Sequence, residues 1–440
     1  MKQDKNPIKV ALDQLFCTYE KIRVFIKLAL TVPNQRQTIK ETKKHLRLHL
    51  PEFLKHEPLF GITPSSISAM NDLQLKTARD KCRQNNSLQP IQRHLVIIHE
   101  LSRTGAPMAA LMLAKTLKKT ADNQVCLLTL KDGPMREEFE QAGINVLTHF
   151  EVPDSKSIFV EFVNDFDMLF ACSVCWDVLR IIGDIKIPVI WWVHEVITHP
   201  IELKRIEVFI SHVDLLLAGS PLVTATFTGN LSPKRIQPLL YGLPPIQKPK
   251  RIHNTGVVTF ALLGSICERK GTDIFIDAIQ RLPSEIRTQA RFIIIGQNDD
   301  NVIFKKLTQA VDEYDEIELY DNMPFKQLVE AYDGFDVVVS ASRNDPMPIV
   351  MTYAFMFSKL CLSSDTTGTA LLMKNMESGL IFKNEDATDL AKKMTYAINN
   401  RLECKKMAED GKKIYQDHFS MNNFEKSIHQ VTNHFINENK

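Results

Sequence analysis

The sequence predicts two doubly wound α/β domains in series, each a parallel sheet with helices on both faces, preceded by a helical extension. A chain of 440 residues is too long for one ordinary hydrophobic core. From residue 94 onward, short apolar runs alternate with amphipathic segments, which is typical of parallel strands joined by helices. The alternation stops at Pro244-Pro245 and then restarts. We therefore expect a basic helical extension and linker at 1–90, domains at 91–245 and 256–420, and a closing helix at 421–440 that crosses back to the first domain.

Strands are expected where continuous apolar runs are bounded by polar or turn residues. In the first domain these runs are Leu95–His99, Gln124–Leu130, Ile144–Leu147, Asp167–Ser173, Pro188–His194, Leu215–Gly219 and Gln237–Tyr241. In the second they are Val257–Leu263, Arg291–Ile295, Ile317–Tyr320, Asp336–Ser340, Leu360–Ser363 and the short run after Gly379. Doubly wound domains bind ligands at the carboxyl ends of their strands, so the loops after these runs are the candidates for function.

The N-terminal extension differs from the rest in charge. Residues 1–93 carry 17 Lys and Arg against 8 Asp and Glu, whereas the whole chain has a net charge of only +2, which argues against a nucleic-acid binder. Residues 8–58 show helical periodicity, and their basic positions are either a solvated face or a docking surface for a membrane or an acidic partner. With no signal peptide and no stretch able to span a bilayer, we expect a cytoplasmic protein with peripheral contact at the inner membrane face through residues 1–90.

The eight cysteines are dispersed, and only Cys172 and Cys175 form a CxxC pair. A zinc site would usually need a second pair of ligands at matching spacing, and the sequence has none. Two buried residues are therefore favoured over a redox pair, and we expect neither a metal nor a cofactor.

Two loops of the first domain carry candidate chemistry. Gly105-Ala106 lies between a strand and a helix, where backbone amides bind anions and a glycine permits close approach. At the end of another strand, His194 and Glu195 follow Trp191-Trp192. Neighbouring strand residues point to opposite faces, so at most one of the two indoles can offer a stacking surface to a ligand.

Three loops of the second domain also contain residues suited to binding or catalysis. Their candidate residues are Ser265, Arg269 and Lys270 after the first strand, Asp345, Pro348 and Tyr353 in the segment Ser340–Ala354, and Thr367 and Gly368 before a further helix.

These stretches, in this order over about residues 94–400, resemble glycosyltransferase family 4, in the branch that reads Asp-Pro-Met-Pro before the helix. The resemblance implies a GT-B fold, in which two Rossmann-like domains face a cleft. It also implies retaining, metal-independent transfer of a sugar from a nucleoside-diphosphate sugar to a saccharide or lipid-linked acceptor, in surface polysaccharide or glycoconjugate synthesis. The nucleotide sugar is then a substrate and not a cofactor.

The resemblance also implies roles. Gly105 and Ala106 face the donor diphosphate, and Lys270 neutralises it, because fixed cations stabilise charge that develops on the leaving group. Asp345 matches the acid that binds hydroxyls of the donor sugar. The implied donor site comprises Gly105, Ala106, Ser265, Arg269, Lys270, Asp345, Pro348, Tyr353, Thr367 and Gly368. The implied acceptor residues are His194, Glu195 and Trp192, and the implied catalytic residues are His194, Lys270 and Asp345.

Two positions depart from the family pattern. Ser265 stands where arginine is common, and Tyr353 stands where a second acid binds the ribose. A phenol cannot bind a diol as a carboxylate does. An alternative is therefore a catalytically silent GT-B partner, which binds an acceptor or stabilises an active glycosyltransferase and binds no nucleoside diphosphate. A GT-B phosphorylase or a sugar-nucleotide epimerase is less favoured, since the sequence lacks a cofactor-lysine context and an acid-rich cleft.

Overall fold

The computed structural model describes residues 92–119, 123–148, 156–174, 182–230, 235–247 and 256–438. The predicted helical extension, its basic surface and Cys175 lie outside the described residues. Within the described ranges, none of the helices is long and apolar enough to cross a membrane.

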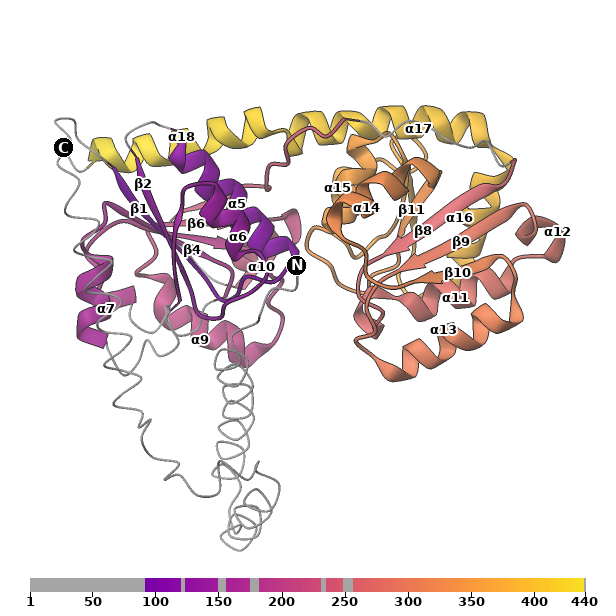
Figure 1. The fold of residues 1–440 in the computed structure, drawn as a ribbon, viewed down its shortest axis with the longest axis horizontal. Helices are drawn as coiled ribbons and strands as arrows, with labels where there is room; N and C mark the ends of the chain where they lie inside the picture. The colour runs from indigo at the N-terminus through magenta and orange to yellow at the C-terminus, as the bar shows by residue number, and fades with distance from the viewer. Residues whose placement is uncertain are drawn as a thin grey trace, which may run out of the picture. The chain divides into compact units, whose positions relative to one another are not determined.

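The first domain is a seven-stranded, fully parallel sheet with the order β3-β2-β1-β4-β5-β6-β7 (Figure 1). Its strands are β1 (Arg93–Ile98), β2 (Gln124–Thr129), β3 (Asn145–Thr148), β4 (Met168–Cys172), β5 (Val189–Val193), β6 (Leu215–Ala218) and β7 (Ile236–Pro238). Its helices are α5 (Gly105–Lys118), α6 (Arg136–Gln141), α7 (Lys156–Val163), the 3-10 turn η1 (Ile182–Asp184), α9 (Pro200–Ile210) and α10 (Pro221–Asn230).

Alternation along the strands divides the core of this domain into two layers. In β1, Val96 and Ile98 pack into the cluster that contains Leu113 of α5, whereas Leu95 and Ile97 pack into the cluster on the other face. That second cluster contains the buried aromatic residues of α7 and the buried apolar residues of α9 and α10. Because both faces of the sheet are covered, the central strands are mostly apolar, as the sequence predicted, with His94 of β1 as a buried polar exception.

The second domain repeats the design with six parallel strands in the order β10-β9-β8-β11-β12-β13. Its strands are β8 (Val258–Leu263), β9 (Ala290–Ile295), β10 (Ile317–Tyr320), β11 (Val337–Ser340), β12 (Leu360–Ser364) and β13 (Leu380–Phe382). Its helical elements are η2 (Glu268–Lys270), α11 (Thr272–Arg281), α12 (Ser284–Arg287), α13 (Asn301–Glu313), α14 (Phe325–Ala331), η3 (Tyr332–Gly334), α15 (Ile349–Met356), η4 (Ala370–Leu372) and α16 (Ala387–Asn399). Each predicted strand is present, with ends that differ by a few residues.

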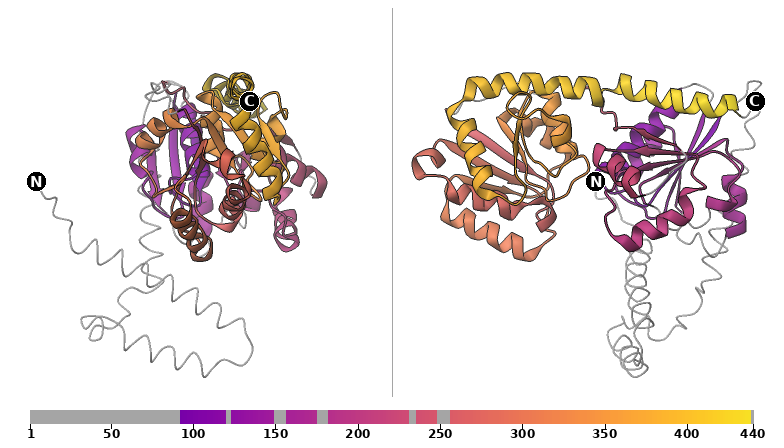
Figure 2. Two further views of the ribbon diagram at one scale, coloured as in Figure 1. Left: turned by 90° about the vertical axis from the view of Figure 1, so that its right-hand side faces the viewer. Right: turned by 180° about the vertical axis from the view of Figure 1, so that it is seen from behind.

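The chain closes with α17 (Arg401–Ile414), a π-helical turn η5 (Tyr415–Phe419) and α18 (Met421–Glu438). Helix α17 contacts β12 and α15 of the second domain, whereas α18 contacts α5 of the first. Figure 2 shows these C-terminal helices in yellow. The ring of Phe424 on α18 stacks on Trp192 of β5 at 5.6 Å between centroids. Residues of the C-terminal helix thus complete the core of the first domain.

Both sheets have one point at which the strand order reverses, between β1 and β4 and between β8 and β11. At such a point the connections leave in opposite directions, and the loops at the carboxyl ends of the two strands border a crevice. The loop after β1 leads to Gly105. The loops after β8 and β11 contain Lys270 and Asp345 respectively. The reversal points therefore coincide with three of the five loops that the sequence motifs indicated.

Candidate functional site

The turn after β8 is held against the end of β11. It comprises η2 and ends at Gly271, which has a positive φ of +69°. A Cβ at this position would lie 1.9 Å from the carbonyl oxygen of Ala341, the residue after β11. Only glycine satisfies both the left-handed backbone and this close approach. The requirement fixes where the side chain before it, Lys270, leaves the turn.

Lys270 forms an ion pair with Asp345. Its Nζ lies 2.6 Å from Oδ2 of Asp345, and Nη1 of Arg269 lies 3.7 Å from the same oxygen. The carboxylate is buried, with 6% of Asp345 exposed, whereas the lysine keeps about a fifth of its side chain in solvent and the arginine about half. One buried acid thus faces two cations of the neighbouring turn.

The loop that carries Asp345 is fixed from its other side by Gly368. The Gly368 N–H donates to the carbonyl oxygen of Asp345 at 3.0 Å, and a Cβ at Gly368 would lie 1.7 Å from the carbonyl oxygen of Pro346. The role of Gly368 in this structure is therefore to let two loops meet, which positions Asp345.

Helix α15 begins directly after this loop. Pro348 is its N-cap residue, and within the described ranges no side chain caps the helix. Lys270, Pro348 and Val350 line a small, mostly apolar hollow of about 10 Å³ together with Leu262, Leu263 and residues 339–342. The unpaired N–H groups of a helix N-terminus carry partial positive charge. A cation beside a helix N-terminus is suited to a phosphate group at the surface above this hollow.

Two of the predicted donor residues, Thr367 and Tyr353, have buried side chains. Thr367 is fully buried, and its Oγ1 lies 2.7 Å from Oγ of Ser363, so its side chain offers no contact to a donor, and a donor contact of this turn through its backbone stays a prediction. Tyr353 is 4% exposed and packs against aromatic rings instead of presenting a phenol as a substitute for the acid. Its ring neighbours are Phe325, Tyr332 and Phe357. Ser265 is half-buried in the turn after Gly264.

The first-domain loop after β1 presents an open helix terminus. Helix α5 begins at Gly105, its first turn carries no acid, and its N-cap residue Thr104 makes no side-chain cap. Gly105 is exposed and has no atom of the described residues within 4 Å of a built Cβ. The amide of Gly105 and that of Ala106 thus lie where a ligand can approach them.

His194 and Glu195 follow β5 directly. The Nε2 of His194 is shielded from solvent and has no hydrogen-bond partner among the described residues. Burial, reinforced by His99, lowers the pKa of His194 to about 3, so its imidazole is neutral at physiological pH. The Glu195 carboxylate accepts the His194 N–H at 3.2 Å, and burial raises its pKa. The Glu195 carboxylate is therefore held against the backbone of this loop.

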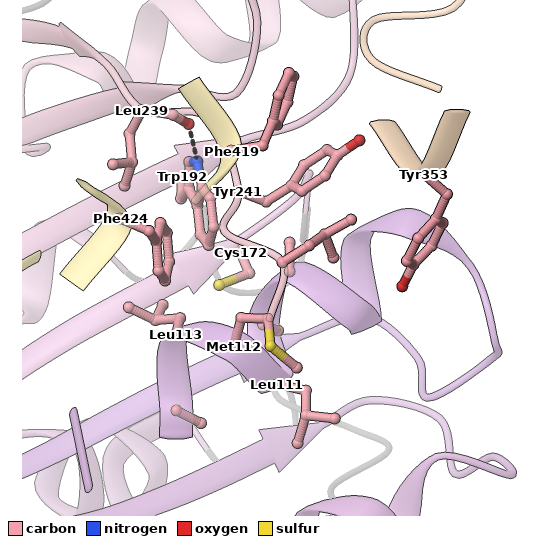
Figure 3. Close-up of a cluster of buried hydrophobic side chains, with 14 of the residues drawn as sticks. Leu111, Met112, Leu113, Cys172, Trp192, Leu239, Tyr241, Tyr353, Phe419 and Phe424 are labelled. Carbon is pink, nitrogen blue, oxygen red and sulfur yellow. Dashed lines mark hydrogen bonds between the residues drawn. The ribbon is translucent and has the colours of Figure 1, made fainter. Parts of the chain in front are cut away.

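The indoles are core residues, as Figure 3 shows for Trp192. Trp192 is 0% exposed, and its Nε1 donates to the carbonyl oxygen of Leu239 at 3.0 Å. Trp191 is equally buried on the opposite face, and its Nε1 donates to the carbonyl oxygen of Ser173. The opposite orientation of the two indoles is confirmed. The prediction that Trp192 contacts an acceptor is wrong, because the indole has no exposed face.

Sequence reasoning missed two polar residues of these loops. His99, after β1, contributes to the electrostatic environment of His194, and its Nδ1 is shielded and without a hydrogen-bond partner among the described residues. Arg343, two residues before Asp345, bonds to the turn that carries Lys270. No motif distinguishes either residue. Within the described part of the chain, no group of three or more His, Cys, Asp and Glu residues could hold a metal ion.

Comparisons with known proteins agree with this architecture. The model of the family described as Glycosyl-transferase family 4 matches residues 91–228, and that of Glycosyl transferases group 1 matches residues 245–414. An uncharacterized glycosyltransferase of Methanocaldococcus jannaschii is 25% identical over 166 residues, which are 37% of this chain and 45% of that relative. The matched part thus spans less than half the length of that relative.

Solved structures show the same fold. The Anabaena protein HepE, crystallised with UDP and glucose, has a TM-score of 0.69 at 15% identity, and the match covers 78% of this chain and 99% of that one. WaaG, a glycosyltransferase involved in lipopolysaccharide biosynthesis, has a TM-score of 0.59 at 14% identity over 77% of this chain and 99% of that one.

The two parallel sheets, with candidate loops at both reversal points, define a protein of the GT-B class. Within that class, the successive family matches over residues 91–228 and 245–414 identify the family. The chain belongs to the GT-B glycosyltransferases of the family 4 type.

Proposed function

We propose that this protein transfers a sugar from a nucleoside-diphosphate sugar to a saccharide or lipid-linked acceptor. The observation that carries the proposal is the placement of Lys270 beside Asp345 at the β8/β11 reversal point, on the same small hollow as the N-terminus of α15. Departure of a nucleoside diphosphate develops negative charge on its oxygens, and a fixed cation and helix N-terminus stabilise that charge. HepE, the structural relative with UDP and glucose bound, supports this ligand class.

In the proposed reaction Lys270 binds the diphosphate and Arg269, which is more exposed, adds a second cation at the rim. Asp345 holds Lys270 in place through their 2.6 Å contact. Its remaining lone pairs accept hydrogen bonds from hydroxyl groups of the donor sugar. The open N-terminus of α5 at Gly105 and Ala106 is the first domain's contribution to the diphosphate site.

We propose that transfer retains the anomeric configuration and needs no metal ion. The first part follows from family membership, and the second from the protein's own cations beside the proposed diphosphate position. His194 is the acceptor-side residue of the proposal, and as a neutral imidazole it orients the acceptor hydroxyl by hydrogen bonding.

The acceptor is proposed to belong to surface polysaccharide or glycoconjugate synthesis, for which the likeness to WaaG is a support at the level of fold. Such acceptors are made at membranes, and the excess of Lys and Arg in residues 1–93 suits contact with anionic lipid. We therefore propose peripheral association with the cytoplasmic membrane face. Unchanged binding to anionic liposomes after deletion of residues 1–90 would contradict this part.

Calorimetric titration of the full chain with UDP, GDP and dTDP, with and without EDTA, tests the proposal. We expect one diphosphate to bind in the micromolar range, equally well with EDTA, and a Lys270→Ala variant to lose that binding. Nuclear magnetic resonance of the anomeric proton in the first product then reports retention or inversion. Loss of binding in EDTA would overturn the metal-independent form.

A second candidate function is a catalytically silent GT-B partner. Two observations favour it: Ser265 replaces the common arginine, and Tyr353 in the second acid position is buried among aromatic rings. Such a subunit would bind none of the three diphosphates and would instead raise the activity of an active glycosyltransferase when mixed with it.

A further inference from the structure

Arg343 lies in the loop between β11 and Asp345, and its side chain joins three segments. Nη1 and Nη2 donate to the two carboxylate oxygens of Asp273 at 2.9 and 2.7 Å, and Nε donates to Glu385 at 2.8 Å. Asp273 lies in the first turn of α11, and Glu385 lies in the loop after β13. The guanidinium is therefore neutralised by two carboxylates of its own and is not a surplus cation for a ligand.

The same residue binds the turn that carries Lys270. Nη1 also donates to the carbonyl oxygen of Glu268, and the Arg343 N–H donates to the carbonyl oxygen of Arg269 at 2.9 Å. The two carbonyl groups that precede Lys270 are thus both bonded to one residue. Gly271, on the other side of Lys270, is pressed against Ala341. The turn is fixed on both sides of the lysine.

From these contacts we propose that Arg343 is a positioning residue, which holds the Glu268–Gly271 turn so that Lys270 meets its ligand at a fixed place. A planar guanidinium supplies several donors in a fixed fork, which one side chain needs here to reach Asp273, Glu385 and the turn together. A lysine ammonium keeps the charge but cannot reproduce this geometry. The inference rests on the proposed function, because it takes the ligand of Lys270 to be a diphosphate.

The test compares Arg343→Lys with Arg291→Lys in the full chain. Arg291 also makes a forked pair, with Glu318 on the neighbouring strand β10, but it contacts neither the turn nor the loop after β11. Calorimetry gives the affinities for UDP and UMP. If the earlier titration shows that the protein binds GDP or dTDP instead, that diphosphate and its monophosphate are used. Hydrogen exchange of residues 264–273 without nucleotide reports directly on the turn.

We expect Arg343→Lys to weaken diphosphate binding about tenfold, the effect of one charge-assisted hydrogen bond. Monophosphate binding should stay within about twofold if, as proposed, Lys270 acts on the diphosphate and the remaining nucleotide contacts are kept. Exchange in 264–273 should become faster, and Arg291→Lys should change neither quantity.

Equal losses for both nucleotides, or unchanged exchange, would overturn the inference. If the wild-type chain binds no nucleotide, the proposed function fails, and the exchange of residues 264–273 alone decides whether Arg343 anchors the turn.

Discussion

The ammonium of Lys270 and a carboxylate oxygen of Asp345 lie 2.6 Å apart, although 75 residues separate them in the chain. Their strands, β8 and β11, are neighbours at the point where the strand order reverses. The pair links the cation proposed to bind the leaving group to the acid proposed to bind the sugar. Loss of either side chain should therefore affect both tasks.

Lys270→Ala is expected to lower turnover by about 10²- to 10³-fold, the range found when one preorganised charge-stabilising group is removed. Acceptor binding should change far less, because the lysine acts on the donor side. Steady-state kinetics with each substrate varied measures both effects. Lys306→Ala is the matched control, since Lys306 makes a 2.6 Å ion pair with Asp277 between α13 and α11. Equal turnover in the two variants would contradict the assignment.

Gly271→Ala is expected to destabilise the protein by about 1–3 kcal/mol or more. The backbone here is left-handed, and the added methyl group would also clash with the Ala341 carbonyl. Gly256→Ala provides the comparison, since Gly256 also has positive φ but no described atom within 4 Å of a built Cβ. The free energy of unfolding from urea titration should fall more for Gly271→Ala. A smaller or equal loss would mean that the turn moves away from β11 without cost.

Trp192→Ala is expected to lower the free energy of unfolding by about 3–5 kcal/mol, as for other large buried aromatic residues. The indole packs against Phe424 and donates a hydrogen bond to Leu239, so its removal leaves a cavity and an unpaired carbonyl. Trp192→Phe should lose less. A Trp192→Phe variant with normal stability and a strongly raised KM for the acceptor would restore the role as an acceptor contact.

Acid should destabilise the first domain through His94. This side chain is 1% exposed, and burial, opposed by Asp167, lowers its pKa to about 4. The unfolded chain takes up the proton near pH 6.5 and the folded chain only near pH 4. Stability is therefore complete above pH 6.5 and declines as the pH falls through this window, by about 1.4 kcal/mol per pH unit.

Urea titrations at pH 7 and pH 5 check this dependence. His94→Gln should make the decline between the two values shallower, with His194 still contributing, whereas His429→Gln, at an exposed position of α18, should leave it unchanged. The same decline in the His94→Gln protein as in the wild type would assign the acid sensitivity to other groups.

The organisation of the domains could be predicted because it depends on local patterns. Continuous apolar runs of strand length predict parallel strands covered on both faces, and each predicted run is a strand in the structure. The loops at strand ends that contain Gly105, Lys270 and Asp345 could also be predicted, since topology requires them at the carboxyl edge. Opposite orientations of Trp191 and Trp192 followed from the period of a strand.

Which side chains remain accessible could not be read from the sequence. The ring of Phe424 covers Trp192, and the hydroxyl of Thr367 forms a hydrogen bond with that of Ser363. Tyr353 packs against rings from α14, η3 and the end of α15. The guanidinium of Arg343 faces acids 70 residues before it and 42 residues after it. The sequence by itself determined which residues lie at strand ends, because that depends on neighbours in the chain. Only tertiary structure decided which of them face solvent, because burial depends on segments that the fold brings together from afar.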